Sequence, residues 1–460
     1  RSCPFSFASF NENVSTHGGA IYSNGSLTLL SSEFSFNTAL SGGAIYATEV
    51  IKIDDGKFYG NSSEVHGGAI LITNCNGTEI TNSLFEYNST TQDAAGGAIW
   101  GLSASVVVRN SLFRDNTADY GGAIALSNGD LTVVDSSFSA NSAKDVDASN
   151  SDYDYGAKLG GAIYVAGILN ITSSIFENNS ALGVSNNSSA GGGALYIEKG
   201  SVLEVSESRF LRNSSYCSSY TVMGGGAICN NGEADIFSCT FMENNADSNG
   251  GAVWNSGTLN LVNSTFLGNS TTYNGGAIFN TKQLNVVNST FTSNKAGLLA
   301  GAIDNDEGTT TIVNSIITGN TNWHDYYDDI SGNITAYYSV IGGINQGTIS
   351  GKHNISGMVA GLIYGNYEPI SETILCNDVE QTYFKVQESE FSSSGTLVGT
   401  FLDGDGELSF AFRDNGKWVR LQDGNTIVSE SVTVITSDQL GNSRLDREAQ
   451  ELYTIGAVNF

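Results

Sequence analysis

Histidine and carboxylate side chains are the groups of this chain that could perform acid–base or metal chemistry. The 460 residues contain only four histidines: His17, His66, His324 and His353. A polysaccharide lyase or glycoside hydrolase would need clustered Asp residues with Arg, Lys or His beside them, and the sequence shows no such constellation. His17 and His66 hold the same position of a repeated motif two repeats apart. Stacked repeats would separate them by about 10 Å, too far for one metal ion. We therefore predict that the chain is not an enzyme, with a carbohydrate-active enzyme as the alternative.

Two acidic segments are candidates for calcium. His324–Asp329 carries three Asp residues, whose carboxylates could bind Ca²⁺, but we expect this segment to be a solvated closing loop. Asp403-Gly404-Asp405-Gly406-Glu407 has part of a calcium-binding pattern and lacks the remaining ligands, so a hairpin turn is the expected structure. No cofactor is predicted, and Ca²⁺ is the one candidate ion.

Cysteine spacing excludes the familiar zinc and redox motifs. The six cysteines are Cys3, Cys75, Cys217, Cys229, Cys239 and Cys376. Cys217, Cys229 and Cys239 are close in sequence and are the candidates for one disulfide in an extracellular protein. The alternative is that they are small buried thiols. Cys3 and Cys75 lie about three repeats apart, roughly 14 Å in a stacked fold, which is too far for a bridge.

The charge balance limits the choice of partners. The formal net charge is −28, with only 19 Lys and Arg residues. Binding to nucleic acid or to an anionic bilayer needs basic patches, and we find none. No stretch approaches 18 apolar residues, and no signal peptide is visible. We expect no nucleic-acid partner, no direct membrane insertion, and a mature or trimmed product.

Two motifs alternate along most of the chain with an uninterrupted period of 25 residues. The motif Gly-Gly-Ala-Ile begins at Gly18, Gly42, Gly67, Gly96, Gly121, Gly160, Gly192, Gly225, Gly250, Gly275 and, in degenerate form, Ala300. The motif Phe-x-x-Asn begins at Phe10, Phe34, Phe58, Phe85, Phe113, Phe138, Phe176, Phe210, Phe241, Phe266 and Phe291.

The repeat predicts a right-handed parallel β-helix of about 12 coils over residues 1–345. Short β-type segments such as Leu259–Val262 lie between the motifs, and no apolar period of 3.6 residues indicates helices. Three strands of four or five residues would complete each coil. A β-rich C-terminal region follows at residues 346–460, with hairpin turns at Asp403–Gly406, Asn415-Gly416 and Asp423-Gly424.

Each motif position has an expected place in a coil. The Ile of Gly-Gly-Ala-Ile and the Phe of Phe-x-x-Asn should point inward, with the Phe rings stacked coil on coil. The Asn should lie at a corner, where its amide donates and accepts hydrogen bonds and can form a ladder along the rod. The paired Gly residues permit a backbone bend that a Cβ would obstruct.

The residue after Gly-Gly-Ala-Ile should point outward, because strand side chains alternate between faces. It is aromatic in seven of eleven repeats: Tyr22, Tyr46, Trp100, Tyr164, Tyr196, Trp254 and Phe279. We call these residues the aromatic row. They could form a stacking platform for sugars, a contact surface for another subunit, or a self-stacking row that only stabilises the rod.

Insertions into the repeat fall almost entirely at one corner. Three of them, at about residues 142–159, 180–191 and 214–224, follow consecutive Phe-x-x-Asn motifs, so their roots should be neighbours in a single protrusion. They carry the candidate recognition residues Asp152, Tyr153, Asp154, Tyr155, Tyr216 and Tyr220. Tyr offers rigid contact area, and Asp can bind sugar hydroxyls or Ca²⁺. The alternative is that solenoid corners tolerate insertions without using them.

The alternation of these two motifs resembles the repeat of the chlamydial polymorphic outer membrane proteins, and adhesin-like surface proteins of bacteria and methanogenic archaea have similar repeats. The resemblance covers about residues 10–320. Asn314–Thr321, Tyr338–Gly343 and Asp438–Arg444 resemble the C-terminal region of β-helix proteins with a choice-of-anchor Q segment.

These resemblances imply an exported, non-catalytic, structural or adhesive protein of the cell surface: an adhesin, surface-layer or filament subunit. Self-association or cell-surface glycans would be its binding modes. Asn-x-Ser/Thr sequons are frequent, and they would be glycosylated only if the source makes N-glycans.

Overall fold

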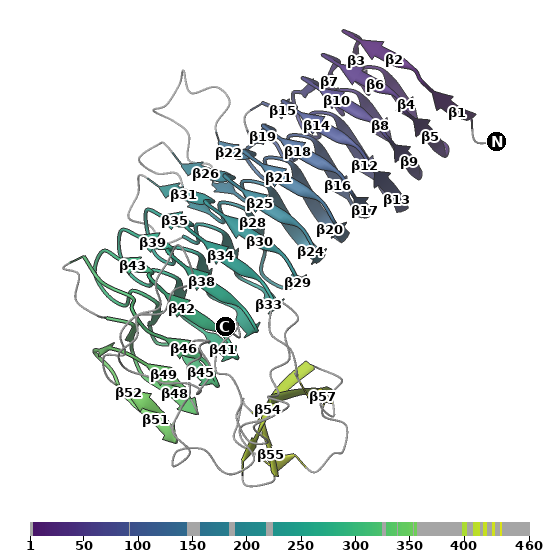
Figure 1. The fold of residues 1–460 in the computed structure, drawn as a ribbon. Helices are drawn as coiled ribbons and strands as arrows, with labels where there is room; N and C mark the ends of the chain where they lie inside the picture. Colours follow the sequence, from purple (N-terminus) through teal and green to yellow (C-terminus); the bar gives the residue numbers. More distant parts are fainter. Residues whose placement is uncertain are drawn as a thin grey trace, which may run out of the picture.

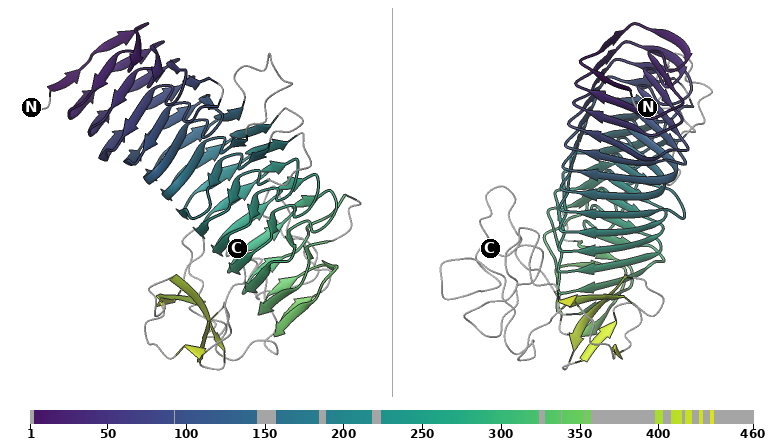
Figure 2. Two further views of the ribbon diagram at one scale, coloured as in Figure 1. Left: turned by 180° about the vertical axis from the view of Figure 1, so that it is seen from behind. Right: turned by 90° about the vertical axis from the view of Figure 1, so that its right-hand side faces the viewer.

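The computed structural model describes residues 3–91, 93–144, 157–183, 189–217, 224–323, 328–337, 339–352 and 354–356, together with five strands between 398 and 434. Residues 3–356 form three long sheets in which all strand pairs are parallel. Figures 1 and 2 show these strands stacked along one axis, from β1–β3 at the N-terminal end to β48–β52 at the other. The predicted parallel β-helix is confirmed.

One coil illustrates how the chain closes. β36 (Val253–Asn255) and β37 (Thr258–Val262) form its long side, β38 (Thr265–Leu267) its second side, and β39 (Ser270–Thr271) its third. Each strand then pairs with its equivalent one coil later, as Phe266 does with Phe291. We name the three sheets A, B and C in this order.

Sheet B contributes one strand to every coil. Its 14 strands are β2 (Ser9–Asn11), β6 (Glu33–Ser35), β10 (Lys57–Tyr59), β14 (Leu84–Glu86), β18 (Leu112–Arg114), β21 (Ser137–Ser139), β25 (Ile175–Glu177), β30 (Arg209–Leu211), β34 (Thr240–Met242), β38, β42 (Thr290–Thr292), β46 (Ile316–Ile317), β49 (Val340–Ile341) and β52 (Ile355–Ser356).

Two details of the coil differ from the expectation. The stack has 14 coils rather than about 12, because β49 and β52 continue it in register, past residue 345 to Ser356. The three sides are also unequal. The long side holds two strands, which merge in β20 (Ile124–Val134) and β24 (Ile163–Thr172), while the strands of sheet B span two or three residues. Sheet B strands are short because Asn follows Phe by only three residues and already forms the next corner.

Aromatic and aliphatic side chains fill the interior as predicted. The eleven Phe rings of Phe-x-x-Asn stack from Phe10 to Phe291, with centroids 4.5 to 5.0 Å apart. This distance is close to one strand spacing, so backbone pairing itself sets the ring stack. From Ile45 to Ile303, the aliphatic residue that ends Gly-Gly-Ala-Ile is fully buried in every coil. The inward assignment of both positions is confirmed.

The two glycines of Gly-Gly-Ala-Ile serve different purposes, as the second copy shows. Gly42 has φ of +63°, a left-handed conformation that favours glycine. Gly43 lies so close to the next coil that a Cβ on it would be 2.0 Å from the carbonyl oxygen of Gly68. The motif therefore turns the chain and lets neighbouring backbones touch at the corner between sheets C and A.

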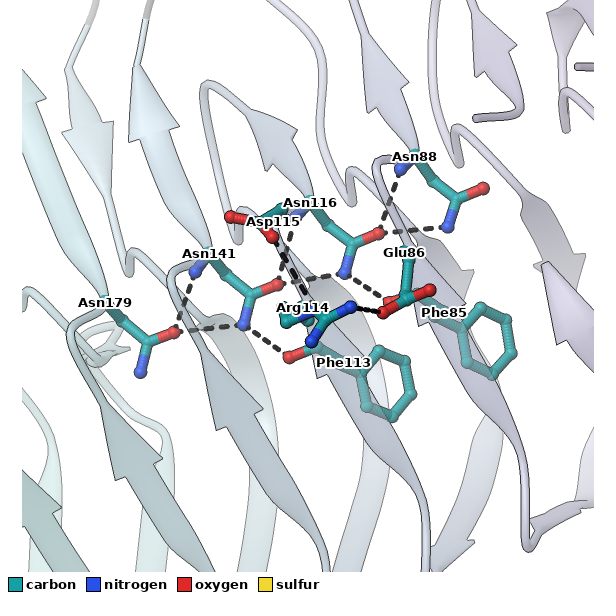
Figure 3. A network of polar contacts seen from close by, with 9 residues as sticks. All are labelled: Phe85, Glu86, Asn88, Phe113, Arg114, Asp115, Asn116, Asn141 and Asn179. Atoms are coloured by element: carbon teal, nitrogen blue, oxygen red, sulfur yellow. Dashed lines mark hydrogen bonds and ion pairs between the residues drawn. The ribbon is translucent and has the colours of Figure 1, made fainter. Parts of the chain in front are cut away.

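An asparagine ladder lines the corner between sheets B and C (Figure 3). The Nδ2 of Asn116 donates to Oδ1 of Asn141 at 2.9 Å and to the carbonyl of Phe85 at 2.9 Å. Its own Oδ1 accepts from the backbone N–H and the Nδ2 of Asn88, at 3.1 and 3.0 Å. The predicted ladder is confirmed. Five of its residues belong to sequons, and four of these (Asn61, Asn88, Asn213 and Asn269) are fully buried and closed to glycosylation in the folded rod, whereas Asn13, at the N-terminal end of the ladder, is exposed.

A serine ladder, which the sequence analysis missed, lines the corner between sheets A and B. The N–H of Ser83 donates to Oγ of Ser111 at 3.1 Å, and that Oγ donates to the carbonyl of Arg109 at 2.8 Å. The signal was present in the sequence, as a Ser two residues before most of the motif phenylalanines.

Beyond Ser356, the described strands of the C-terminal region pair in antiparallel fashion. It contains β53 (Val398–Leu402), β54 (Leu408–Asp414), β55 (Lys417–Arg420), β56 (Thr426–Ile427) and β57 (Thr433–Val434). The three predicted turns fall between β53 and β54, β54 and β55, and β55 and β56, and each of these pairs is antiparallel. The hairpin prediction is confirmed, while the rest of residues 357–460 lies outside the described residues.

Replacing Asn116 by Leu should lower the free energy of unfolding by several kcal/mol. The change removes the acceptor of the Asn88 backbone N–H, one of the two acceptors of the Asn88 side-chain amide, and the side-chain donor to the carbonyl of Phe85, at about 1–3 kcal/mol for each buried group left unsatisfied. Phe113→Ala should cost about 3–5 kcal/mol through the cavity it opens. Chemical denaturation measures both effects, with Ser139→Ala on the outward side of β21 as the control. Unfolding of both core variants at the parent midpoint would contradict the inward assignment.

Candidate recognition surfaces

The roots of the three long inserts lie side by side, as predicted. β22 (Ser142–Lys144), β26 (Ser180–Gly183) and β31 (Ser214–Cys217) are consecutive strands of sheet C, and Leu182 pairs with both Lys144 and Tyr216. The returning segments β23 (Lys158–Leu159) and β27 (Ala190–Gly191) also pair in parallel. The inserts therefore leave the rod at one corner over consecutive coils.

Most of the candidate residues in the inserts lie outside the described residues: Asp152, Tyr153, Asp154, Tyr155 and Tyr220. Tyr216, at the end of sheet C in its coil, is 45% exposed. A recognition role for these loops stays a prediction.

A buried ion pair, missed by the sequence analysis, fixes the return of the first insert. Nζ of Lys158 lies 2.8 Å from Oδ2 of Asp119, and both side chains are essentially without solvent exposure. The same carboxylate oxygen accepts the backbone N–H of Asp93 at 2.9 Å. Removing either partner would leave the other charge buried and unpaired, which is strongly destabilising. The ion pair therefore holds the base of the insert against the preceding coils.

The aromatic row is in register, but the structure does not make it one exposed platform. Tyr22 is 56% exposed, and Tyr46, Trp100 and Tyr164 are partly buried. Tyr196, Trp254 and Phe279 are buried, with exposed fractions of 4%, 7% and 5%. Together with Cys229 and Leu159 they form a small apolar cluster outside the main core. These three residues thus face outward from the coil, as predicted, but they are buried there and offer no exposed platform.

Two pairs of neighbouring rings in the row stack on one another. Tyr22 and Tyr46 have centroids 5.4 Å apart, and Tyr164 and Tyr196 are 5.6 Å apart. The row is interrupted by the non-aromatic residues Leu71, Ala125 and Cys229. The observed contacts agree best with the third alternative, in which stacked rings only stabilise the rod, here in short runs.

The predicted disulfide does not form between Cys229 and Cys239, which are both free, buried thiols, as is Cys75. Cys229 lies on the outward face of β32 (Ile228–Asn230) in the apolar cluster, whereas Cys239 belongs to the main core. The wall of the coil separates the two sulfurs. Cys239 replaces a serine of the serine ladder and donates from Sγ to the carbonyl of Phe237 at 3.2 Å. The side chain of Cys217 lies outside the described residues.

The two histidines that the structure describes, His17 and His66, do not meet at a metal site. Nδ1 of His66 accepts the backbone N–H of Ala95 at 3.1 Å, and its ring stacks on Trp100 at 4.3 Å. Burial lowers the pKa of His66, which favours the neutral ring. His324 and His353 lie outside the described residues. Among the residues that the structure describes, no group of three or more His, Cys, Asp or Glu side chains is arranged to hold a metal ion.

The expected solvated loop at His324–Asp329 is wrong at its C-terminal end, where Asp328 and Asp329 are buried. Oδ1 of Asp329 accepts the backbone N–H and the Nδ2 of Asn320 at 2.9 and 2.7 Å, and Oδ2 accepts the N–H of Gly343 at 2.6 Å. Asp329 thus takes the place of the next asparagine in the ladder. It reaches this position because the chain passes from Asn320 to β47 (Ile330–Ser331) without a strand of sheet C among the described residues.

Burial shifts the acidity of two carboxyl groups near this end. Desolvation raises the pKa of Asp329 to about 6, against the hydrogen bonds from Gly343 and Asn320 that lower it. Desolvation also raises the pKa of Asp304, on the outward face of β44 (Ile303–Asn305), to about 6, and Asp306 and Asp328 add to the shift. These carboxyls serve the fold's hydrogen-bond network, since their partners are amides, a hydroxyl and backbone N–H groups.

The rod should become more stable as the pH falls from 7.5 to about 4.5. A folded-state pKa near 6, above the unfolded value, contributes stability at low pH that is lost as pH rises through 6. Asp304→Asn should therefore raise the melting temperature by a few degrees at pH 7.5, with the difference vanishing near pH 4.5. Thermal unfolding at several pH values measures this, with Asp130→Asn, at an exposed position of β20, as control. A pH-independent difference between parent and Asp304→Asn would contradict the assignment.

Two comparisons with known proteins gave a match. The sequence model of the Chlamydia polymorphic membrane protein repeat matches residues 263–281, one unit containing both motifs. The solved structure of a mannuronic acid specific polysaccharide family 6 lyase enzyme from human gut microbiota is similar over 78% of this chain and 83% of that chain, at 10% identity and a TM-score of 0.33. A search of curated protein sequences found no match.

The chain is thus a parallel β-helix whose repeats resemble those of the polymorphic membrane proteins. Likeness to the choice-of-anchor Q region stays a prediction, since Asp438–Arg444 lies outside the described residues. Within the described part of the chain, no helix has the length and apolarity needed to cross a membrane.

Proposed function

We propose that this chain is the rod of an extracellular cell-surface protein and acts as a non-catalytic structural or adhesive scaffold. The observation that carries the proposal is the alternation of the two motifs through eleven coils, one of which matches the polymorphic membrane protein repeat. That family's name places it at a membrane surface, which supports an exposed location for a chain built of the same unit.

The use of the repeated residues supports a scaffold. Phe, Ile, Ala and Asn of the two motifs are buried in the stack, and both glycines are required by the backbone. The repeat therefore supplies shape and rigidity, and recognition must come from residues that vary between coils. In this chain such variation is concentrated in the outward positions and the corner inserts.

Uncharged surface glycans fit this surface best, and further copies of the chain are the second candidate, because each copy carries the same negative charge. A net charge of −28 repels polyanions over the whole rod, and salt screens this repulsion only beyond about 10 Å. Adhesion would then rest on aromatic and hydrogen-bonding groups rather than on charge.

A scaffold should not degrade polysaccharides. Incubation of the purified rod with alginate or pectin should release no more unsaturated or reducing ends than a buffer blank, measured by absorbance at the double bond and by a reducing-sugar assay. The acidic coat and the structural engagement of the buried carboxyls are the physical reasons. Depolymerisation above the blank that a single Asp substitution abolishes would establish the enzyme alternative.

Shortening the three inserts should leave the rod folded and reduce adhesion. The cuts lie between β22 and β23, between β26 and β27, and after β31, so that the paired strands and Lys158 are retained. Protease accessibility on intact cells measures surface display, and attachment of cells to host or neighbouring cells measures adhesion. A matched control keeps each insert at full length with its Tyr and Asp residues replaced by Ser and Gly. Unchanged adhesion in the shortened variant would show that the inserts have no recognition role.

A further inference from the structure

Three exposed aromatic side chains form a second aromatic surface, separate from the aromatic row. Phe36, Tyr59 and Tyr87 lie at the corner between sheets B and C, just after or at the ends of β6, β10 and β14, which Figure 1 shows as successive strands. Their exposed fractions are 52%, 40% and 49%. The ring centroids of Phe36 and Tyr59 are 5.3 Å apart, those of Tyr59 and Tyr87 are 5.4 Å apart, and both pairs are edge-to-face. We call these residues the aromatic corner.

The backbone at this corner opposes bulky side chains. Phe36 and Tyr87 have φ of +53° and +55°, in the left-handed region that disfavours large residues. The same position is left-handed in every coil from Glu12 to Gly319, and it also holds Arg212 and Asp115, the latter drawn in Figure 3. The fold therefore accepts many residue types here and does not require aromatic ones.

The neighbouring coil is shaped to receive one of the rings. A Cβ on Gly60 would lie 2.8 Å from Cε1 and 2.9 Å from Cδ1 of Phe36. The glycine thus leaves a seat for the ring, which holds Phe36 against the next coil and edge-to-face with Tyr59.

The size of the aromatic corner decides between classes of partner. Three aromatic side chains that are about half exposed offer roughly 300 Å² in total, taking ~150–250 Å² for each complete side chain. A stable protein interface needs about 800 Å² on each partner. The corner is too small for such an interface, but one ring per coil along the rod axis suits a narrow linear polymer.

Charge further restricts that polymer. Two cations lie near the corner. Arg114 is ion-paired with Glu86 and also lies 3.7 Å from the carboxylate of Asp115, and both pairs are drawn in Figure 3. Lys57, exposed on β10 two residues before Tyr59, is in register with Glu33 of the preceding coil. Each cation thus has an acidic neighbour, and the chain as a whole is strongly acidic. An anionic polysaccharide would be repelled, whereas the apolar faces of neutral sugar rings can pack on aromatic side chains.

We propose that the aromatic corner binds an uncharged linear polysaccharide, which lies along the rod with its sugar rings packed on Phe36, Tyr59 and Tyr87. The proposal rests on the scaffold function argued above and gives that scaffold a ligand class and a site. The site lies in the N-terminal coils, away from the inserts of the middle coils, so the two surfaces can be tested separately.

The test is affinity electrophoresis of the purified rod in native gels that contain hydroxyethyl cellulose, mannan or dextran, with alginate as the anionic comparison. The parent should be retarded by at least one of the three neutral polymers and not by alginate. The double variant Phe36→Gly/Tyr87→Gly should bind that polymer at least about tenfold more weakly, as expected for two lost ring contacts. Its melting temperature should stay close to the parent's, because glycine suits both left-handed positions.

Ala140→Gly is the matched control, since Ala140 is exposed at the equivalent position with φ of +54° and has no ring to lose. It should bind like the parent. A parent that ignores all three neutral polymers overturns the proposal and leaves a protein contact as the use of this corner. Equal retardation of parent and double variant overturns it as well. Surface display and insert-dependent adhesion are measured on intact cells, so failure here leaves the scaffold function standing.

Discussion

Parallel backbone pairing between successive coils is the constraint on which the rest of this structure depends. Every strand pairs in register with its equivalent one coil later, so each inward side chain must accept a near copy of itself at one strand spacing, about 4.8 Å. Phe satisfies this by stacking its ring, and Asn and Ser satisfy it by donating and accepting at once. Charged side chains of one sign would repel their copies one strand spacing away, and the repeated interior positions contain none.

Ladders of amides have a direction, and their ends need a different residue. Each asparagine of the main ladder donates toward the C-terminal end. The last amide therefore needs an acceptor that has no N–H of its own to donate further. Asp329 supplies it for Asn320. A second, outward ladder runs the other way, from Asn285 to Asn260 and then to the carboxylate of Asp235. Both ladders end, in the donor direction, on a carboxylate, the one polar side chain that only accepts when ionised.

The repeat period predicted the places of residues that stack on their equivalents in the next coil. It did not predict residues whose surroundings differ from coil to coil. The Phe stack, the inward Ile and the Asn ladder follow from the motifs, because each repeat meets the same environment. The end of the ladder at Asp329 could not be predicted, since it depends on a coil in which sheet C is reduced, among the described residues, to one bridge at Thr321. The burial of Trp254 and the separation of Cys229 from Cys239 depend on which side of the coil wall each residue faces and on what packs outside it. The repeat period carries no information about what packs against the outside of the coil.

The same constraint indicates where a solenoid of this kind can carry function. A change inside the stack disturbs three coils at once, because each rung contacts the rung before and the rung after it. An outward or corner residue has fewer contacts with the coils before and after it, so neighbouring coils can carry different residues at that position. The residue before each ladder asparagine shows this freedom, being Phe36, Gly60, Tyr87 and Asp115 in successive coils over an unchanged ladder. The ladder fixes where these side chains stand, one strand spacing apart along a rigid edge, and leaves their chemistry open. A rod can therefore change its ligands by single substitutions without changing its fold.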